Sequence, residues 1–437
     1  MDAVSPFEII CGKDERVQVD PMTSPPYQWI CYLWIKSTSG DKWYFGSGFK
    51  IHLPGVNRTA IVTAGHCTYV DGAYADKIIV TFPGHPATHV DPKDLFAAPE
   101  FIKSGSPDHD YGLILLPEPG TSDDGFGWSA IVADEELKDR IVTNCGYPAD
   151  KDRGTMWITG GKITRYTTNR IFYMNDTMGG QSGSPVYTWH DGYWTVIGVH
   201  SYGSCPNSAP RFTTQMIYRF LEFMNSLKVK SLRSFAFPNV YVRCDGSGVT
   251  EHVPSGGGTV NCQYKPPGPF EKFYICPVEV TPSLAAESHY KVEIQSASFS
   301  DVLIRLDGRG MSHFDGNGGG LVNCQYTAST FERFYLQRES NGCYSFRSVQ
   351  FPHCYIRLDG ENVNSWSGSS GGTVNCQLYD TPPFPTSPTP VGSHETFYVE
   401  EESFYQSPRP ARSVKLALLP PSLFYFEVNK DSCKITT

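Results

Sequence analysis

Short apolar runs, separated by glycine and proline, dominate the hydrophobic pattern in the first half of the chain. Two of them cover residues 29–35 and 43–45, and turn residues such as Pro54 and Gly55 follow. Apolar runs of this length that end at turn residues are typical of β-strands. The same pattern predicts strands at residues 59–63, 111–116, 141–144 and 156–164, and a hairpin with its turn near residues 190–192.

One segment instead repeats its apolar residues with the period of a helix. Ile217, Phe220, Leu221 and Met224 would share one face of a helix over residues 213–227. Elsewhere, runs of helix-favouring residues are scarce, whereas the chain has 41 glycines, 33 prolines and 14% aromatic residues. This composition is typical of a loop-rich, mostly β protein, and 437 residues suggest two or three domains.

The second half of the chain contains a threefold repeat. The copies begin with residues 241–246, 303–308 and 355–360, each ending in Asp-Gly, and an Asn-Cys-Gln triplet starts sixteen residues after each aspartate. Asp-Gly between alternating apolar residues is a hairpin signal. Three copies of about four strands predict a β-trefoil over residues 229–437, similar to the fascin-type trefoil family. Residues 413–428 are only a faint echo of a repeat.

Charge and hydropathy narrow the partners. The net charge of −9 argues against a nucleic-acid surface, and no apolar run is long enough to insert into a membrane. The first residues lack the basic and apolar regions of a signal peptide, which favours a cytoplasmic protein, with unconventional secretion left open. We therefore expect the 13 cysteines to be reduced thiols.

Candidate chemistry begins with the segment 176–185, where glycines flank Ser182 on both sides. Glycines let the backbone adopt positive φ and pass close to a substrate. The N–H groups of Gly180 and Ser182 could point at the place where an acyl-transfer intermediate develops negative charge. A serine alone is a poor nucleophile, so this interpretation requires a histidine base and a carboxylate that orients it.

Both partners occur upstream. His66 follows a buried strand, and the small residues Ala64 and Gly65 leave room for another segment to reach it. Asp110 stands at the head of an apolar strand, where a buried carboxylate needs a hydrogen-bond partner such as a histidine ring. The alternative for His66 is a structural role, because most histidines are not catalytic. The alternative for an acid in this segment is a solvated position in a turn, which fits Asp108 better than Asp110.

The order His66, Asp110, Ser182, with its three short motifs, resembles the chymotrypsin/trypsin-like serine peptidases. The resemblance implies an all-β domain over residues 1–228 with two barrels and a C-terminal helix. It implies hydrolysis of protein or peptide substrates by a Ser-His-Asp triad, without a metal or organic cofactor. Cys67 departs from the family, because the upstream segment lacks its usual cysteine partner, and is expected to be a free thiol.

The sequence near the serine is similar to the glutamyl endopeptidase branch, with Thr177 five residues before it and His200 downstream. This resemblance implies that both residues hydrogen-bond a substrate carboxylate and favour Glu, or Asp, before the scissile bond. A hydroxyl and an imidazole do offer donors to an acid. The alternative for His200 is a histidine whose partners all lie within a strand.

The same branch implies that a freed α-amino group helps to neutralise the acid of the substrate. Cleavage after Glu8 would free Ile9 and make residues 1–8 a short propeptide. An unprocessed, frayed N-terminus is the alternative.

Two sets of side chains recur in the repeats. Cys262, Cys324 and Cys376 occupy one position and are expected to fill the core rather than bind metal. Arginines occupy another, and either form three pockets for a sugar or an actin-like filament, or pair with acids on the barrel. These are Arg243, Arg305 and Arg357.

The sequence therefore predicts a serine endopeptidase of the glutamyl type with a trefoil for targeting or substrate binding. The alternative is a carbohydrate- or cytoskeleton-binding trefoil protein whose peptidase domain is silent or regulatory.

Overall fold

A computed structural model describes residues 10–53, 56, 58–119, 125–224, 226–281, 289–368, 370–379 and 391–401. These residues divide into two compact units. The first contains the described residues up to Met224 and residues 280–281, and the second contains the others. Each unit is built mainly from β-strands, as predicted. No helix in the described ranges is long and apolar enough to cross a membrane.

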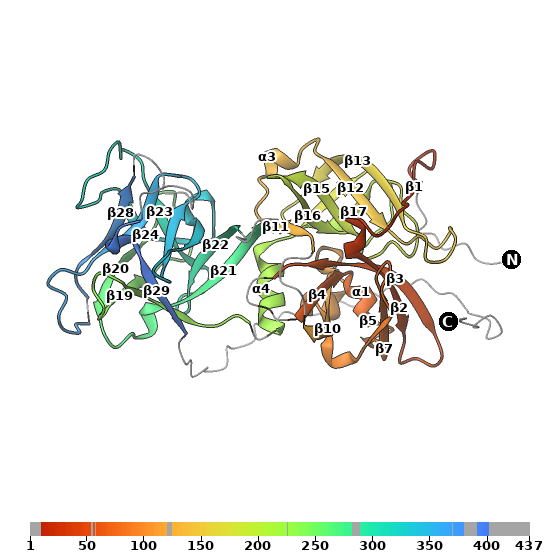
Figure 1. Cartoon of the computed structure of the whole chain (residues 1–437), viewed down its shortest axis with the longest axis horizontal. Coiled ribbons are helices and arrows are strands. Elements are labelled where there is room, and N and C mark those ends of the chain that lie inside the picture. Colours follow the sequence, from red (N-terminus) through yellow and green to blue (C-terminus); the bar gives the residue numbers. More distant parts are fainter. Residues whose placement is uncertain are drawn as a thin grey trace. The chain divides into compact units, whose positions relative to one another are not determined.

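The first unit contains two groups of strands, which Figure 1 shows one above the other. A seven-stranded sheet has the order β8-β7-β2-β3-β4-β10-β9. Its strands are β2 (Ile30–Lys36), β3 (Trp43–Ile51), β4 (Arg58–Thr63), β7 (Lys77–Thr81), β8 (Thr88–Val90), β9 (Leu95–Ala97) and β10 (Gly112–Pro119). A separate two-stranded sheet pairs β5 (Tyr69–Val70) with β6 (Ala73–Tyr74).

The other group follows later in the chain. In it, β13 pairs with β12 and β14, β15 pairs with β12 and β16, and β14 pairs with β17. Its strands are β1 (Val17–Gln18), β11 (Gly127–Ser129), β12 (Ile141–Gly146), β13 (Trp157–Tyr166), β14 (Arg170–Tyr173), β15 (Pro185–His190), β16 (Tyr193–Val199) and β17 (Asn207–Pro210). All the strands predicted in this half are therefore present. Most of them end within two residues of the prediction, but β3 runs six residues beyond the predicted end at Phe45 and β10 three residues beyond Leu116.

Each strand group has its own core, because alternate side chains of a strand point to the same face. Leu33, Ile61 and Ile114 belong to the core of the first group. Ile163 and Val186 belong to the core of the second. The segments that connect strands carry most of the side chains expected to act in chemistry, which places them at the edges of these cores.

The connecting segments also match the sequence pattern. Asp191 and Gly192 both have positive φ, 49° and 79°, as a two-residue hairpin turn between β15 and β16 requires. The helices of this unit are α1 (Gly65–Thr68), α2 (Pro99–Ser104), α3 (Asp134–Leu137) and α4 (Thr214–Phe223), with 3-10 turns η1 (Tyr27–Trp29), η2 (Pro92–Asp94) and η3 (Pro107–His109).

Helix α4 is shorter than the predicted helix over residues 213–227. The Thr213 side chain caps its start by accepting a hydrogen bond of 3.2 Å from the Met216 N–H. Met224 is the C-cap, and residues 226–229 already lead in non-helical conformation into the next strand. Apolar residues with helical spacing continue past Phe223, where α4 ends, so the sequence pattern predicted a helix that is too long.

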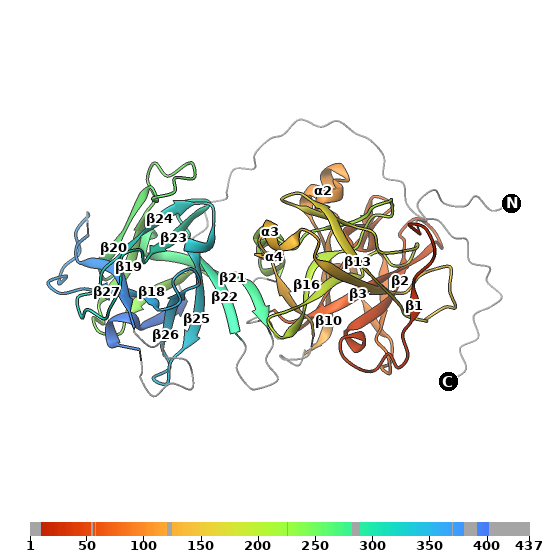
Figure 2. The same cartoon turned by 90° about the horizontal axis from the view of Figure 1, so that it is seen from above.

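The second unit has hairpins in three equivalent copies, seen from two directions in Figures 1 and 2. Its strands are β18 (Lys230–Ser234), β19 (Val240–Asp245), β20 (Gly258–Tyr264), β21 (Lys272–Thr281), β22 (His289–Ser296), β23 (Val302–Asp307), β24 (Leu321–Tyr326), β25 (Arg333–Arg338), β26 (Tyr344–Ser348), β27 (Cys354–Asp359), β28 (Thr373–Leu378) and β29 (Phe397–Glu401), with 3-10 turns η4 (Pro269–Glu271), η5 (Thr330–Glu332) and η6 (Ser393–Glu395). The hairpins β19–β20, β23–β24 and β27–β28 share one register. Residues 413–428 lie outside the described residues.

The three hairpins also bridge one another in a cycle. Gly258 in the first pairs with Cys324 in the second, Gly319 before the second pairs with Cys376 in the third, and Gly371 before the third pairs with Cys262 in the first. The three cysteines are buried and free, in a shared apolar core. The prediction that they fill the core is confirmed.

Candidate active site

His66 and Asp110 are joined by two hydrogen bonds. The backbone N–H of His66 donates to Asp110 Oδ1 at 2.8 Å, and His66 Nδ1 lies 2.7 Å from Oδ2. Gly65 makes this approach possible, because a Cβ there would lie only 3.0 Å from Asp110 Oδ1. Strand β10 begins at Gly112, and Asp110, two residues before it, is fully buried.

The pair also sets the protonation of the imidazole. An ionised carboxylate can only accept hydrogen bonds, so His66 Nδ1 carries a proton and Nε2 is left as the basic atom. Burial of the ring opposes protonation, but the attraction of the Asp110 carboxylate outweighs it and raises the pKa of His66 well above its usual value. The His66 side chain keeps 18% of its surface exposed, so Nε2 belongs to a ring that solvent or substrate can reach.

The loop that carries Ser182 is docked against β3 and β4. The Ser182 carbonyl accepts a hydrogen bond of 2.8 Å from the Ser47 N–H, and Cys67, next to His66, directs its Sγ at the same carbonyl at 3.8 Å. Gly183 has a φ of 86°, and a Cβ there would overlap Ser47 O and Thr63 Oγ1. Cys67 is a free thiol, as expected.

The backbone before Ser182 has a conformation that favours glycine. Gly180 has a φ of 92°, and its carbonyl accepts a hydrogen bond of 2.9 Å from Ser47 Oγ. Among the described residues, the N–H groups of Gly180 and Ser182 have no hydrogen-bond acceptor. Two amides without internal partners are available to a developing oxyanion.

Gln181 holds this loop together and was missed by the sequence analysis. Its Oε1 accepts from the Met178 N–H at 2.9 Å and its Nε2 donates to Asn144 Oδ1 at 3.2 Å. The side chain is fully buried. Gln181 lies inside the glycine-rich motif, so its position in the sequence could have singled it out. Nothing in the sequence identifies its partner Asn144 in β12.

His200 is placed directly behind the serine loop. Its carbonyl accepts from the Gly183 N–H at 2.7 Å, and its N–H donates to the Ser184 carbonyl at 2.9 Å. His200 Nδ1 lies 2.7 Å from the hydroxyl of Tyr173, at the end of β14. Burial, together with positive charge nearby, lowers the pKa of His200 to about 3. The imidazole is therefore neutral at physiological pH, and its contact with Tyr173 involves only Nδ1.

Thr177 is buried in the loop that leads from β14 to Ser182. The residue before it, Asp176, anchors the N-terminal segment of the chain. Its Oδ1 accepts from the Cys11 N–H and its Oδ2 from the Glu15 N–H, both at 2.8 Å. This arrangement brings the beginning of the described chain beside Thr177. Glu8 and Ile9, the proposed processing site, lie outside the described residues.

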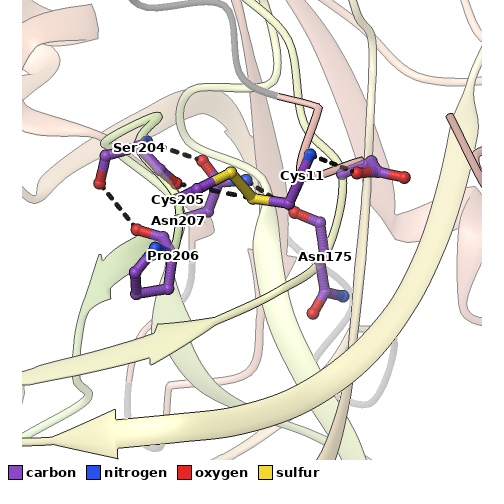
Figure 3. The surroundings of a disulfide bond; sticks show 7 residues. Cys11, Asn175, Ser204, Cys205, Pro206 and Asn207 are labelled. Carbon is purple, nitrogen blue, oxygen red and sulfur yellow. Dashed lines mark hydrogen bonds between the residues drawn. A yellow bond between two sulfur atoms is a disulfide. The ribbon is translucent and has the colours of Figure 1, made fainter. Parts of the chain in front are cut away.

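A disulfide between Cys11 and Cys205 fastens the same segment (Figure 3). The loop that carries Cys205 is tied further by Asn207, whose Nδ2 donates to the Asn175 carbonyl at 2.7 Å and whose Oδ1 accepts from the Ser204 N–H at 3.0 Å. Disulfides persist in oxidising environments. The expectation that the cysteines are all reduced is wrong for this pair, because the tertiary fold brings together two residues 194 positions apart. A cytoplasmic location stays a prediction.

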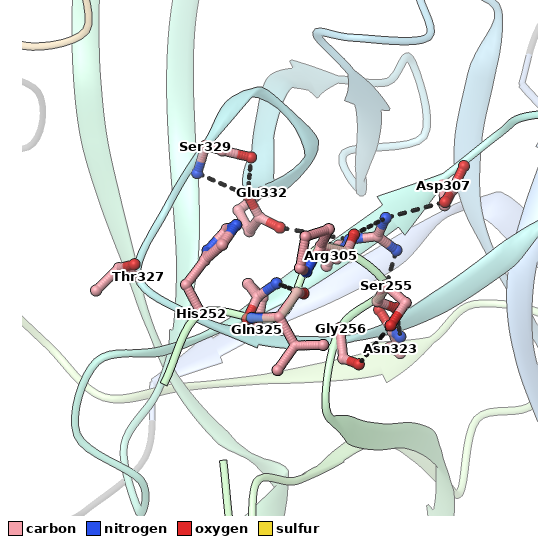
Figure 4. A network of polar contacts seen from close by, with 12 residues as sticks. His252, Ser255, Gly256, Arg305, Asp307, Asn323, Gln325, Thr327, Ser329 and Glu332 are labelled. Carbon is pink, nitrogen blue, oxygen red and sulfur yellow. Dashed lines mark hydrogen bonds and ion pairs between the residues drawn. The ribbon is translucent and has the colours of Figure 1, made fainter. Parts of the chain in front are cut away.

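The repeated arginines of the second unit are buried rather than open to a ligand. Arg305 is 1% exposed, and its guanidinium lies 2.9 Å from Asp307 and 3.7 Å from Glu332 (Figure 4). The guanidinium also lies 4.7 Å from the centre of the Phe331 ring. It also donates to the Pro254 carbonyl at 3.0 Å, which ties the loop of the preceding hairpin. The equivalent ion pairs are Arg243 with Asp245 and Glu271, and Arg357 with Asp359 and Glu395. Of the two interpretations of these arginines, ion pairing is correct.

Comparison with known proteins places the first unit. The family model described as Trypsin matches residues 53–223. A glutamyl endopeptidase of Bacillus licheniformis is 31% identical over 242 residues, which cover 51% of this chain and 72% of that protein. A protein of Bacillus subtilis called extracellular metalloprotease is 29% identical over 231 residues, covering 51% of this chain and 71% of that one.

Among solved structures, that of a Glu endopeptidase in complex with MPD shares 25% identity and a TM-score of 0.40, and covers 50% of this chain and 98% of the other. These matches fall on about half of the chain. The match to the Trypsin family model and the relative that is 31% identical show that the chain belongs to the trypsin-like serine peptidases and is a serine endopeptidase with a chymotrypsin-like domain in its N-terminal half.

Proposed function

We propose that the protein cleaves peptide bonds after Glu, or Asp, with Ser182 as nucleophile, His66 as general base and Asp110 as the group that orients the imidazole. The observation that carries this proposal is the pairing of both Asp110 oxygens with His66, at 2.8 and 2.7 Å. This pairing leaves His66 Nε2 as the basic atom beside the serine loop.

In this mechanism the Ser182 hydroxyl attacks the peptide carbonyl and transfers its proton to His66. The N–H groups of Gly180 and Ser182 stabilise the oxyanion that forms. The protonated imidazole, stabilised by Asp110, then gives the proton to the leaving amine. Water repeats these steps on the acyl-enzyme and releases the product acid.

The preference for an acidic side chain rests on Thr177 and His200. A carboxylate in the pocket would accept hydrogen bonds from the Thr177 hydroxyl and from His200 Nε2, since Tyr173 occupies Nδ1. The anchored segment that begins at residue 10 supports a further contribution, because an α-amino group freed at Ile9 would lie two residues from Cys11. Glutamyl endopeptidases among the relatives favour the same assignment.

The test uses a pair of peptides that differ only in Glu or Gln before the scissile bond. Wild-type protein should cleave the Glu peptide faster, and Ser182→Ala should lose on the order of 10⁶ in kcat. His200→Ala should still react with a serine-directed fluorophosphonate but lose most of the Glu preference. If the wild type shows neither hydrolysis nor labelling, the assigned triad is wrong, and an unchanged Glu preference in His200→Ala refutes the pocket alone.

We also propose that residues 229–437 form a β-trefoil accessory domain and residues 1–228 the peptidase domain. The three hairpins of identical register and their cyclic bridges support this arrangement. Because the three repeated arginines are buried, a sugar would have to bind to other side chains. One repeat position in the long hairpin loops carries three exposed rings, His252, Phe314 and Trp366.

Exposed aromatic rings at equivalent positions favour a carbohydrate as the trefoil ligand over an actin-like filament. The double variant Phe314→Ala with Trp366→Ala should lose binding to a glycan array while peptide hydrolysis continues. Co-sedimentation with filamentous actin but no glycan binding would contradict the assignment of a sugar.

A further inference from the structure

A surface pocket of about 410 Å³ lies beside the triad in the first unit. Its lining includes Asp108, two residues before Asp110, and Tyr202 and Gly203, which follow His200 by two and three residues. The same chain segments therefore build the pocket and the site of the reaction. A peptide whose acidic residue enters between Thr177 and His200 would continue along residues 200–204 toward this pocket.

A buried cation forms part of the pocket. Arg170, at the start of β14, is 6% exposed. Its Nη2 donates to Ser208 Oγ at 2.9 Å, and its guanidinium carbon lies 4.8 Å from the centre of the Tyr202 ring. Its Nη1 is shielded from solvent and, within the described residues, has no hydrogen-bond partner. Buried guanidinium N–H groups normally have one, because an unpaired polar group in a low dielectric is costly.

The carboxylate that compensates this charge is held loosely. Asp108 Oδ1 lies 3.6 Å from Arg170 Nη1, which is beyond hydrogen-bond length, and the Asp108 side chain is 45% exposed. Asp108 belongs to the 3-10 turn η3 and faces solvent with almost half of its surface. A second carboxylate that reaches the pocket can therefore replace it at Nη1 without leaving Arg170 unpaired.

We propose that Arg170 forms an acid-binding subsite, in which the carboxylate of a second acidic residue, two to four positions before the scissile bond, replaces Asp108 as the partner of Arg170. The substrates of the peptidase would then carry clustered acidic residues rather than a single Glu. This inference rests on the proposed function, since it presumes cleavage after an acidic residue. Arg170 would then determine specificity although it belongs neither to the triad nor to the pocket formed by Thr177 and His200.

The test measures kcat/KM for quenched peptides that share Glu before the scissile bond and differ only in Glu or Gln at the second, third or fourth position before it. At one of these positions wild-type protein should favour Glu about tenfold, the effect of one hydrogen bond to a charged group, and added salt should reduce the ratio. Arg170→Met should bring the ratio close to one, and Arg170→Lys should restore part of it.

Two further variants complete the design. Asp108→Asn removes the competing carboxylate and should raise the ratio. If Arg170→Met does not fold, Asp108→Asn decides the question, because the Asp108 side chain is 45% exposed and tolerates the change. Arg165→Met removes a solvent-facing cation from neighbouring β13 and should leave the ratio as in wild type, which excludes an effect of net charge alone.

A ratio near one at all three positions in the wild type overturns the inference, as does an unchanged ratio in Arg170→Met or Asp108→Asn. If the wild type cleaves no Glu peptide at all, the proposed function has failed. Cleavage after Glu with no upstream preference refutes only the subsite.

Discussion

Replacing Gly183 by alanine should displace Ser182 from its position in the proposed site. The residue has a φ of 86°, and an added Cβ would overlap Ser47 O and Thr63 Oγ1 and come within 3.0 Å of Ala64 N. The left-handed backbone costs alanine about 1–2 kcal/mol. Overpacking against fixed neighbours costs about 1–3 kcal/mol more. We expect a total destabilisation of about 2–5 kcal/mol, relieved in part by movement of the serine loop.

Activity assays would detect this movement of the serine loop. The carbonyl of Ser182 accepts a hydrogen bond of 2.8 Å from the Ser47 N–H, so a shift of the loop moves Ser182, the proposed nucleophile, relative to His66. A displacement of about 1 Å in a catalytic group lowers the rate about 10²-fold. The assays are urea denaturation for the free energy of unfolding, and kcat/KM with fluorophosphonate labelling for the nucleophile.

Gly192→Ala is the matched control for this variant. Gly192 has a φ of 79°, but nothing lies within 4 Å of its added Cβ. It should show only the backbone cost of about 1–2 kcal/mol and keep wild-type kcat/KM. If Gly183→Ala is as stable and as active as Gly192→Ala, the contact between the serine loop and β3 does not hold the nucleophile, and the reasoning is refuted.

Three other variants test neighbouring contacts. Asp110→Asn should lower kcat by about 10⁴ and, because burial then acts on His66 without an opposing carboxylate, lower the pKa of that imidazole. Catalysis needs the neutral ring, so the acid limb of the pH–rate profile should move to lower pH, and a limb that stays or rises contradicts the assignment. Tyr173→Phe removes the 2.7 Å contact with His200 and should reduce cleavage of Glu peptides more than that of Gln peptides, about tenfold in ratio; equal losses would count against it. Cys205→Ser should lower the free energy of unfolding by about 2–4 kcal/mol in urea denaturation, and a reductant should produce the same loss in the wild type but none in the variant.

Local chemistry explains what could be predicted. The motif around His66 needs small neighbours, and Gly65 is what allows Asp110 within hydrogen-bond distance. Alternating apolar residues and turn residues predicted the strands correctly, because every second side chain of a strand points into the core. The turn at residues 191–192 followed for the same reason, since few residues tolerate positive φ.

Contacts between distant segments explain what could not. Nothing in the sequence near Arg170 marks it as a neighbour of Asp108 and Tyr202, since antiparallel pairing and loop packing bring them together. The repeated arginines could have served a ligand or an ion pair, and their burial at 1–6% exposure, together with the carboxylates beside them, decided between the two.

The sequence by itself determined the strand-rich architecture, the threefold repeat and the residue types of the proposed triad, because these depend on local period and on short motifs. The tertiary structure alone decided which donors remain unpaired. It assigned both oxygens of Asp110 to His66 and Tyr173 to His200, and it left Nη1 of Arg170 with a carboxylate at 3.6 Å. Hydrogen-bond partners and desolvation depend on distance in space rather than along the chain, so the chemistry of the site emerges only when the strands have packed.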